Sequence, residues 1–139
     1  MEKVFIYGTL RRGFCNHEYV WGRIGFLGLC ATSKPYPLVI GARWRSPYLI
    51  DEPGEGMCVK GDLFEADEDA LKIMDQLESV GKPKGYLRQK IMVTRADGPE
   101  VEAWAYLKRR EDVEGDVSEP IAEYADDPDY VAPMKRKRA

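Results

Sequence analysis

The chain has 139 residues, of which 44% are hydrophobic and 32% charged, as is ordinary for a single globular domain with a core of its own. The net charge is −3, but four of the 21 cations lie at Lys135–Arg138, so residues 1–134 carry 17 cations against 24 acids and a net charge of −7. An acidic body of this kind disfavours nucleic acid as a partner. We therefore expect one domain over residues 1–134 and a basic tail over 135–139, either a nuclear import signal or a solubilising end.

Features that the sequence lacks disfavour a membrane-spanning, a secreted or a zinc-binding protein. No apolar run reaches membrane-spanning length, and the first residues lack the apolar segment of a secretory signal. Three cysteines, Cys15, Cys30 and Cys58, are widely spaced and odd in number, which indicates free thiols in a reducing compartment. A single histidine and the absence of a C-x-x-C pair disfavour a zinc site. We expect a cytoplasmic monomer that needs no metal, no cofactor and no membrane.

Strands and turns follow from the hydrophobic pattern. Alternating or β-rich runs predict strands at Val4–Tyr7, Leu38–Ile40, Val59–Phe64, Arg88–Thr94 and Val101–Leu107. The Gly and Pro cluster at Asp51–Gly56 predicts a loop that leads into a strand, and Ala96–Pro99 predicts a hairpin turn. The acidic stretch from Glu111 to Asp129 reads as a surface loop. Together with one helix, these elements predict an α+β domain with a curved sheet or a small barrel.

The first predicted strand runs directly into a loop of small residues. Val4–Tyr7 is followed by Gly8, Thr9 and Leu10. Backbone N–H groups of such a turn point the same way and can hold a carboxylate or a developing oxyanion. Many turns of this composition only connect two elements, so the pattern alone leaves both interpretations open.

The helix is predicted from Asp67 onward. Asp67 suits the N-cap, and acidic residues follow in the first turn, where they complement the helix dipole. Leu71, Met74 and Glu78 recur at spacings of three and four and therefore share one face. This pattern places the carboxylate of Glu78 on the face that is otherwise committed to the core.

Glu78 is accordingly the candidate for proton transfer. Partial burial and the negative end of the helix dipole both disfavour an ionised carboxylate, which suits the side chain to acid–base work near neutral pH. The structural alternative is that Glu78 has left the helix and either points to water or pairs with Arg88 or Lys82. A Cys15–His17 pair is a weaker candidate, because no third group that would orient the histidine is evident.

Several stretches together resemble the gamma-glutamylcyclotransferase-like superfamily, and most closely its gamma-glutamylamine cyclotransferases. The resemblance covers about residues 3–107 and runs through these segments in order: Val4–Gly13 with Asn16-His17, Tyr36–Ile40, Pro53–Gly56, Val59–Phe64, Met74–Ser79, and Tyr86 with Arg88. A weaker similarity continues at Tyr124 and Tyr130. The motifs are specific jointly rather than singly.

The resemblance implies a small mixed β-barrel with flanking helices, Glu78 as the catalytic acid–base, and Tyr7, Gly8, Thr9 and Leu10 as the substrate-binding loop. It implies release of 5-oxoproline and a free amine from γ-glutamyl-ε-lysine-type isopeptides, with a small γ-glutamyl substrate as the only partner. Two alternatives stay open: the same chemistry on other γ-glutamyl conjugates, and a non-catalytic interaction domain of the same fold.

One departure from the family pattern concerns specificity. The stretch from Val80 to Gly85 is longer than is usual for gamma-glutamylamine cyclotransferases, and we expect it to border the pocket of the leaving amine. Its two lysines, Lys82 and Lys84, favour a leaving group that carries a carboxylate. The identity of that amine is therefore the part that the sequence leaves open.

Overall fold

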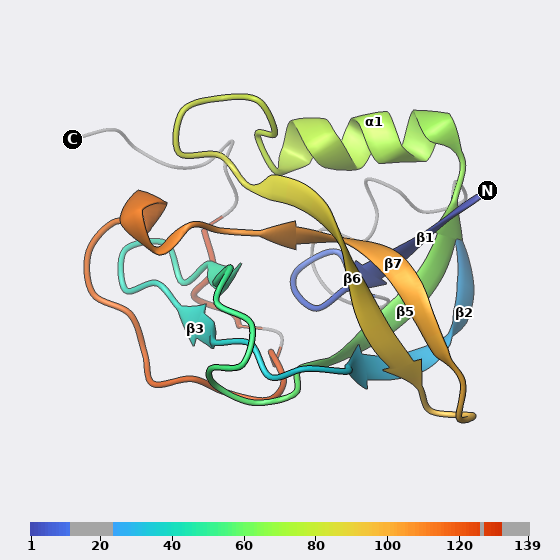
Figure 1. Cartoon of the computed structure of the whole chain (residues 1–139). Coiled ribbons are helices and arrows are strands. Elements are labelled where there is room, and N and C mark those ends of the chain that lie inside the picture. The colour runs from blue at the N-terminus through green and yellow to red at the C-terminus, as the bar shows by residue number, and fades with distance from the viewer. Residues whose placement is uncertain (12–23, 126, 132–139) are drawn as a thin grey trace.

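The computed structural model describes residues 1–11, 24–125 and 127–131. Five strands form a closed barrel in the order β1, β5, β2, β6, β7 (Figure 1). Their bounds are β1 Glu2–Ile6, β2 Ile24–Thr32, β5 Lys60–Ala66, β6 Leu87–Arg95 and β7 Glu100–Leu107. β1 runs parallel to β7, whereas the other pairs are antiparallel. The predicted α+β fold with a small mixed barrel is confirmed.

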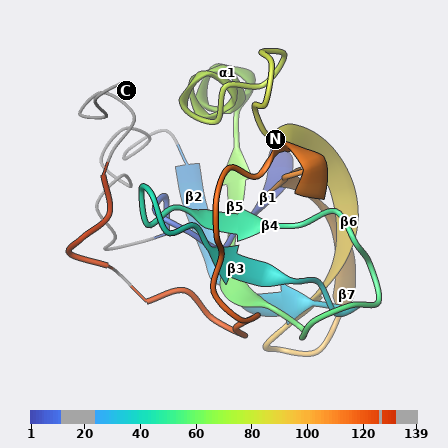
Figure 2. The ribbon, with the colours of Figure 1, turned by 90° about the vertical axis from the view of Figure 1, so that its left-hand side faces the viewer.

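Smaller elements surround this barrel. Helix α1 spans Glu68–Leu77 and lies along one side of it (Figure 1). Strands β3, Leu38–Ile40, and β4, Pro47–Leu49, form a two-stranded antiparallel sheet at one end of the barrel, which faces the viewer in Figure 2. A short 3₁₀ helix at Arg110–Asp112 follows β7. The connection from α1 to β6 begins with Glu78, and the turn after β1 contains Gly8, Thr9 and Leu10, the residues that the sequence singles out.

Side chains of the barrel strands alternate between two hydrophobic layers. On β7, Ala105 and Leu107 point into the barrel with Phe5 and Leu63, whereas Tyr106 packs on the helix side. Leu71 and Met74 of α1 fill that second layer and are buried, as their helical spacing predicts. Each buried side chain of this size contributes about 1.5–3 kcal/mol relative to exposure, so the layer holds α1 against the barrel.

All five predicted strands are present, with ends shifted by at most two residues. Strand β2 was not predicted because its two glycines interrupt the β-rich pattern. Gly28 has a φ of +136°, and the register to β5 shifts between Phe26 and Gly28, which marks a β-bulge. Strand β4 was not predicted either, since three residues that begin with a proline carry too little periodicity.

The sequence predicted that the acidic segment after Arg110 is a surface loop, but the structure shows that part of it packs against the core. Its Ile121 N–H donates to the Leu38 carbonyl at 2.8 Å, and the Ser118 N–H donates to the Ile40 carbonyl at 2.9 Å. The side chain of Tyr124 is fully buried in the barrel core. This segment therefore runs beside β3 and closes that part of the core.

Two expectations concern residues outside the described ranges: the Cys15–His17 pair and the basic tail at 135–139. Within the described ranges, Cys30 and Cys58 are free thiols, and burial raises the pKa of the Cys30 thiol to about 12. Over the same ranges no helix combines the length and apolar character of a membrane span.

Candidate active site

Helix α1 begins where the sequence predicts. The Asp67 carboxylate accepts a hydrogen bond from the Ala70 N–H at 2.8 Å and so caps the first turn. Glu68 and Asp69 lie in that turn, where the dipole favours negative charge. The last helical residue is Leu77, so Glu78 occupies the C-cap position.

The end of the helix holds Glu78 in a defined place. The Ser79 N–H donates to the Gln76 carbonyl at 3.2 Å, and the Val80 N–H donates to the Asp75 carbonyl at 2.9 Å. These two bonds form a Schellman motif. Ser79 takes the left-handed conformation, with a φ of +55°, which costs a residue with a side chain about 1–2 kcal/mol. The left-handed conformation is the one that the C′ residue of a Schellman motif ordinarily adopts, so Ser79 ends the helix directly after Glu78.

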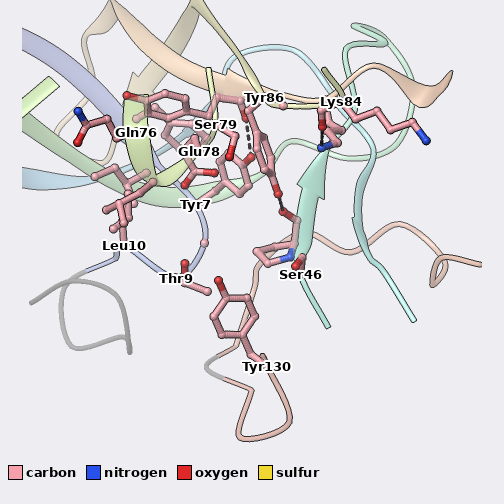
Figure 3. Close-up of a pocket in the computed structure, with 18 of the residues that line it drawn as sticks. Tyr7, Thr9, Leu10, Ser46, Gln76, Glu78, Ser79, Lys84, Tyr86 and Tyr130 are labelled. Atoms are coloured by element: carbon pink, nitrogen blue, oxygen red, sulfur yellow. Dashed lines mark hydrogen bonds between the residues drawn. The ribbon is translucent and has the colours of Figure 1, made fainter. Parts of the chain in front are cut away.

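A cavity of about 340 Å³ opens between the C-terminal end of α1, the turn after β1 and the loop that leads to β6 (Figure 3). All five residues that the sequence singled out line it. They are Tyr7, Gly8, Thr9, Leu10 and Glu78. The structure thus brings together two segments that lie about seventy positions apart in the chain, although their roles in binding and catalysis stay predictions.

Glu78 is half-buried, and its carboxylate lies beside the ring of Tyr7 in Figure 3. Burial, and after it the negative charge of Glu78, raises the pKa of the Tyr7 phenol well above its ordinary value of 10.0. The same charge also contributes to the raised pKa of Tyr86, after burial and the neighbouring Tyr7. The carboxylate therefore sits among phenol groups that stay protonated at neutral pH.

A chain of hydrogen bonds connects the two sides of the cavity. The Tyr7 hydroxyl donates to the Tyr106 carbonyl at 2.5 Å, and the Tyr106 hydroxyl donates to the Asp75 carboxylate at 2.7 Å. The guanidinium of Arg88 lies 3.2 Å from the same Asp75 oxygen. Arg88, which the sequence offered as a partner for Glu78, thus pairs with Asp75, one turn earlier. The hydrogen bonds of Tyr7 and Tyr106 thus connect the turn after β1, through β7, to the helix that precedes Glu78.

The loop after Glu78 borders the cavity, as the sequence predicts, through Ser79 and residues 83–86. The Tyr86 N–H donates to the Glu78 carbonyl at 3.0 Å, and the Tyr86 hydroxyl donates to the Pro47 carbonyl at 2.8 Å. Gly85 is required by close packing, because a Cβ there would lie 1.9 Å from the Ser79 carbonyl oxygen. These contacts join the loop to both Glu78 and β4.

The two lysines of this loop do not present charge to the cavity in the way the sequence suggested. Lys82 is not among the lining residues, and the Lys84 ammonium lies 3.4 Å from Glu114 in an exposed pair. In Figure 3 the Lys84 side chain points away from Glu78. The lining lysine whose side chain is buried is instead Lys108, which follows β7 and which sequence reasoning missed.

Sequence reasoning also missed other residues that line the cavity. They include Ser46, Pro47 and Tyr106. Tyr130, which the sequence marked only as a weak similarity, also lines the cavity. The position of Tyr106 had a signal, since it alternates with buried Ala105 and Leu107 and must face the helix side. Ser46 and Pro47 belong to a segment without periodicity, so nothing in their neighbourhood pointed to the site.

Comparison with known proteins places this architecture in a family. The family described as "Gamma-glutamyl cyclotransferase, AIG2-like" matches residues 4–126. The chain belongs to this family of gamma-glutamyl cyclotransferases.

Individual relatives are similar over two thirds or more of this chain. The gamma-glutamylaminecyclotransferase of Rattus norvegicus is 38% identical over 97 residues, which cover 67% of this chain and 64% of the rat protein. The human gamma-glutamylaminecyclotransferase is 37% identical over 106 residues, covering 72% of this chain and 69% of the human protein. A crystal structure of an AIG2-like protein from Mus musculus superimposes with a TM-score of 0.83 at 28% identity, covering 99% of both chains.

Proposed function

We propose that this protein is a gamma-glutamylamine cyclotransferase that releases 5-oxoproline and a free amine, such as lysine, from γ-glutamyl-ε-lysine-type isopeptides. The observation that carries the proposal is the meeting of the Glu78 carboxylate with the Tyr7–Leu10 turn around one cavity. The family membership supports cyclotransferase chemistry, and the names of the rat and human relatives support an amine as the leaving group.

The reaction is an intramolecular aminolysis. The α-amine of the γ-glutamyl group attacks its own γ-carbonyl carbon, and the carbonyl electrons move to oxygen in a tetrahedral intermediate. Glu78 accepts the proton that the attacking nitrogen loses. When the bond to the leaving nitrogen breaks, Glu78 returns a proton to that nitrogen, so its own protonation state is restored. Because the nucleophile is tethered, the protein has mainly to select the folded substrate and move protons.

The turn after β1 is assigned to the γ-glutamyl half of the substrate. Tyr7, Gly8, Thr9 and Leu10 all line the cavity, and the Arg11 N–H donates to the Gly8 carbonyl at 3.0 Å, which closes the turn. A Cβ at Gly8 would lie 2.9 Å from Pro47, so a side chain there would press the turn against β4. A rigid turn of this kind is suited to hold a carboxylate or an oxyanion against main-chain groups.

Glu78→Gln tests the assignment. The amide keeps the volume of the side chain but cannot exchange protons, so kcat for 5-oxoproline release should fall about 10²–10⁴-fold. Glu100→Gln is the matched control, because it removes an exposed carboxylate of β7 that does not line the cavity. Thermal melting of both variants checks that the fold is retained. A Glu78→Gln enzyme with near-wild-type kcat would remove Glu78 from the mechanism.

A substrate panel separates the remaining alternatives. Wild-type protein is assayed for 5-oxoproline release from γ-glutamyl amines and γ-glutamyl amino acids. A preference for amine conjugates supports the proposal, and a preference for amino acids joined through their α-nitrogen supports the broader cyclotransferase activity. Release of 5-oxoproline from no conjugate would favour a non-catalytic domain of this fold.

A further inference from the structure

A short segment far from Glu78 in the chain, residues 127–131, contributes to the cavity wall through Tyr130. The tyrosine is half-buried and lines the same cavity as Glu78. In the view of Figure 3 it lies below Thr9 and Ser46 with its hydroxyl toward them, whereas Lys84 lies at the opposite corner. Tyr130 thus belongs to the end of the cavity formed by the turn after β1. The mechanism proposed above gives it no part.

Two polar contacts fasten this segment to the turn between β3 and β4. The Arg45 Nε donates to an Asp127 carboxylate oxygen at 2.9 Å, and the Val131 N–H donates to the Trp44 carbonyl at 3.0 Å. The two contacts lie on either side of Tyr130 in the chain. They therefore fix the backbone that carries the tyrosine at both ends.

Asp127 also shapes the segment from within. Its second carboxylate oxygen accepts the Asp129 N–H at 2.9 Å, and its carbonyl accepts the Tyr130 N–H at 3.1 Å. An aspartate that bonds to the backbone two residues later stabilises a turn. Because the same side chain pairs with Arg45, the ion pair fixes the orientation of that turn. The Asp127 side chain is 14% exposed and that of Arg45 47%, so the pair is partly shielded from solvent.

The turn that carries Arg45 is itself held in place. The Gly41 N–H donates to the Ser46 carbonyl at 2.9 Å, and the Arg45 N–H donates to the Gly41 carbonyl at 3.0 Å. Arg45 and Ser46 are neighbours in the chain, and Ser46 lines the cavity while Arg45 reaches Asp127. One turn therefore sets both a part of the cavity wall and the place of Tyr130 beside it.

We propose that residues 127–131 belong to the substrate site: Tyr130 contacts the γ-glutamyl half of the substrate, and the Arg45–Asp127 ion pair positions it. Arg45 is then a positioning residue, since it does not line the cavity and acts through Tyr130. The proposal rests on the proposed function, which assigns the γ-glutamyl half to the turn after β1. The segment should accordingly affect the binding of every γ-glutamyl conjugate by the same factor, whichever amine departs.

Binding of 5-oxoproline tests the proposal without turnover, because this product retains only the γ-glutamyl half. Isothermal titration calorimetry measures its Kd for the wild type and the variants. Tyr130→Ala removes the ring and should raise the Kd about tenfold, the scale of one well-placed aromatic contact. Arg45→Met keeps the ring but releases the segment, and should raise the Kd about twofold to fivefold, since partly exposed ion pairs contribute modestly. Arg45→Lys keeps the charge and should retain part of the affinity.

Arg110→Met is the matched control. Arg110 is an exposed arginine whose Nε donates to Glu52 at 2.7 Å, and it does not line the cavity. Its loss should leave the Kd unchanged. Asp127→Asn tests the other partner, because the amide oxygen can still accept the Asp129 N–H while the charge is gone. Its Kd should rise as in Arg45→Met, and the double variant should bind no more weakly than either single variant.

Steady-state kinetics gives a readout that a general loss of stability would not move. On γ-glutamyl-ε-lysine, the KM of Arg45→Met should rise by the same factor as the Kd of 5-oxoproline. Its kcat should stay near that of the wild type, because Glu78 is untouched. The difference in Kd between wild type and Arg45→Met should shrink at high salt, since salt screens a partly exposed ion pair.

Three results would overturn the proposal while the proposed function stands. The first is an unchanged Kd for 5-oxoproline in Tyr130→Ala or in Arg45→Met. The second is a lower kcat with unchanged KM in Arg45→Met, which would make the segment act on the reaction rather than on binding. The third is an altered ranking of leaving amines in Tyr130→Ala, which would assign the tyrosine to the departing half. If the wild type releases 5-oxoproline from no conjugate, the proposed function fails and this inference fails with it.

Discussion

Tyr106→Phe removes the hydroxyl that joins strand β7 to helix α1. The hydroxyl donates to the Asp75 carboxylate at 2.7 Å, and Arg88 holds the same oxygen at 3.2 Å. A hydrogen bond to a charged group contributes about 1.5–3 kcal/mol. Because the Asp75 side chain is 24% exposed and keeps Arg88, we expect the lower end of that range, about 1.5 kcal/mol.

This free energy converts into a melting shift. An entropy of unfolding of about 2.1 cal/mol/K per residue gives ~0.3 kcal/mol/K for 139 residues, so the variant should melt about 5 °C lower. Thermal unfolding followed by circular dichroism at neutral pH measures the shift. Tyr36→Phe is the control, since it removes a hydroxyl from another buried tyrosine that lies outside the cavity. It should shift the melting temperature less and leave 5-oxoproline release unchanged.

Activity provides the second readout. Asp75 lies one turn before Glu78 on α1, and Tyr106 also accepts the hydroxyl of Tyr7 at its carbonyl. Without the Tyr106 hydroxyl the helix end is held less firmly, and kcat should fall severalfold. A variant that melts like the wild type would refute the reasoning, because the hydrogen bond would then contribute nothing that Arg88 and water do not replace.

Two further predictions follow from packing and burial. Gly85→Ala would place a Cβ 1.9 Å from the Ser79 carbonyl oxygen, so the loop must open and 5-oxoproline release should fall. In the control Gly25→Ala the new Cβ meets only a side chain at 3.7 Å, so stability and activity should both stay unchanged. Equal activities of the two variants would contradict the conclusion that close packing requires a glycine at position 85. Burial raises the pKa values of Tyr7 and Tyr86 above their ordinary value of 10.0, so their contribution to stability is fully present below about pH 10 and is lost as the pH rises above it. Denaturant unfolding at a series of alkaline pH values measures that loss, and a stability that stays constant through this range would contradict it.

Local signals were sufficient for part of the site. The side chain of Asp67 and the spacing of Leu71 and Met74 predicted where α1 begins and which face it buries, because capping and helical periodicity depend on residues close in sequence. The same spacing put Glu78 at the end of that face, and Glu78 lines the cavity at the end of the helix. Its role in catalysis stays a prediction. Strand β2 escaped prediction because a bulge at Gly28 breaks the period of two.

The acidic segment after β7 shows the opposite case. Its composition predicted a loop exposed to solvent, yet Tyr124 is buried in the barrel and Ile121 pairs with Leu38. Charged neighbours dominate the local pattern, whereas burial depends on the strand against which the segment lies. No window of sequence around Tyr124 contains that information.

By itself, the sequence determined the helix, most of the strands, the turn after β1 and the position of Glu78, because each follows from short-range spacing and from the family resemblance. Only the tertiary structure decided which lysine enters the cavity wall and that Tyr7 and Tyr106, 99 positions apart, hold its two sides together. The physical reason is barrel closure: pairing β1 with β7 brings the end of the last strand beside the turn after the first, a neighbourhood that no local pattern encodes.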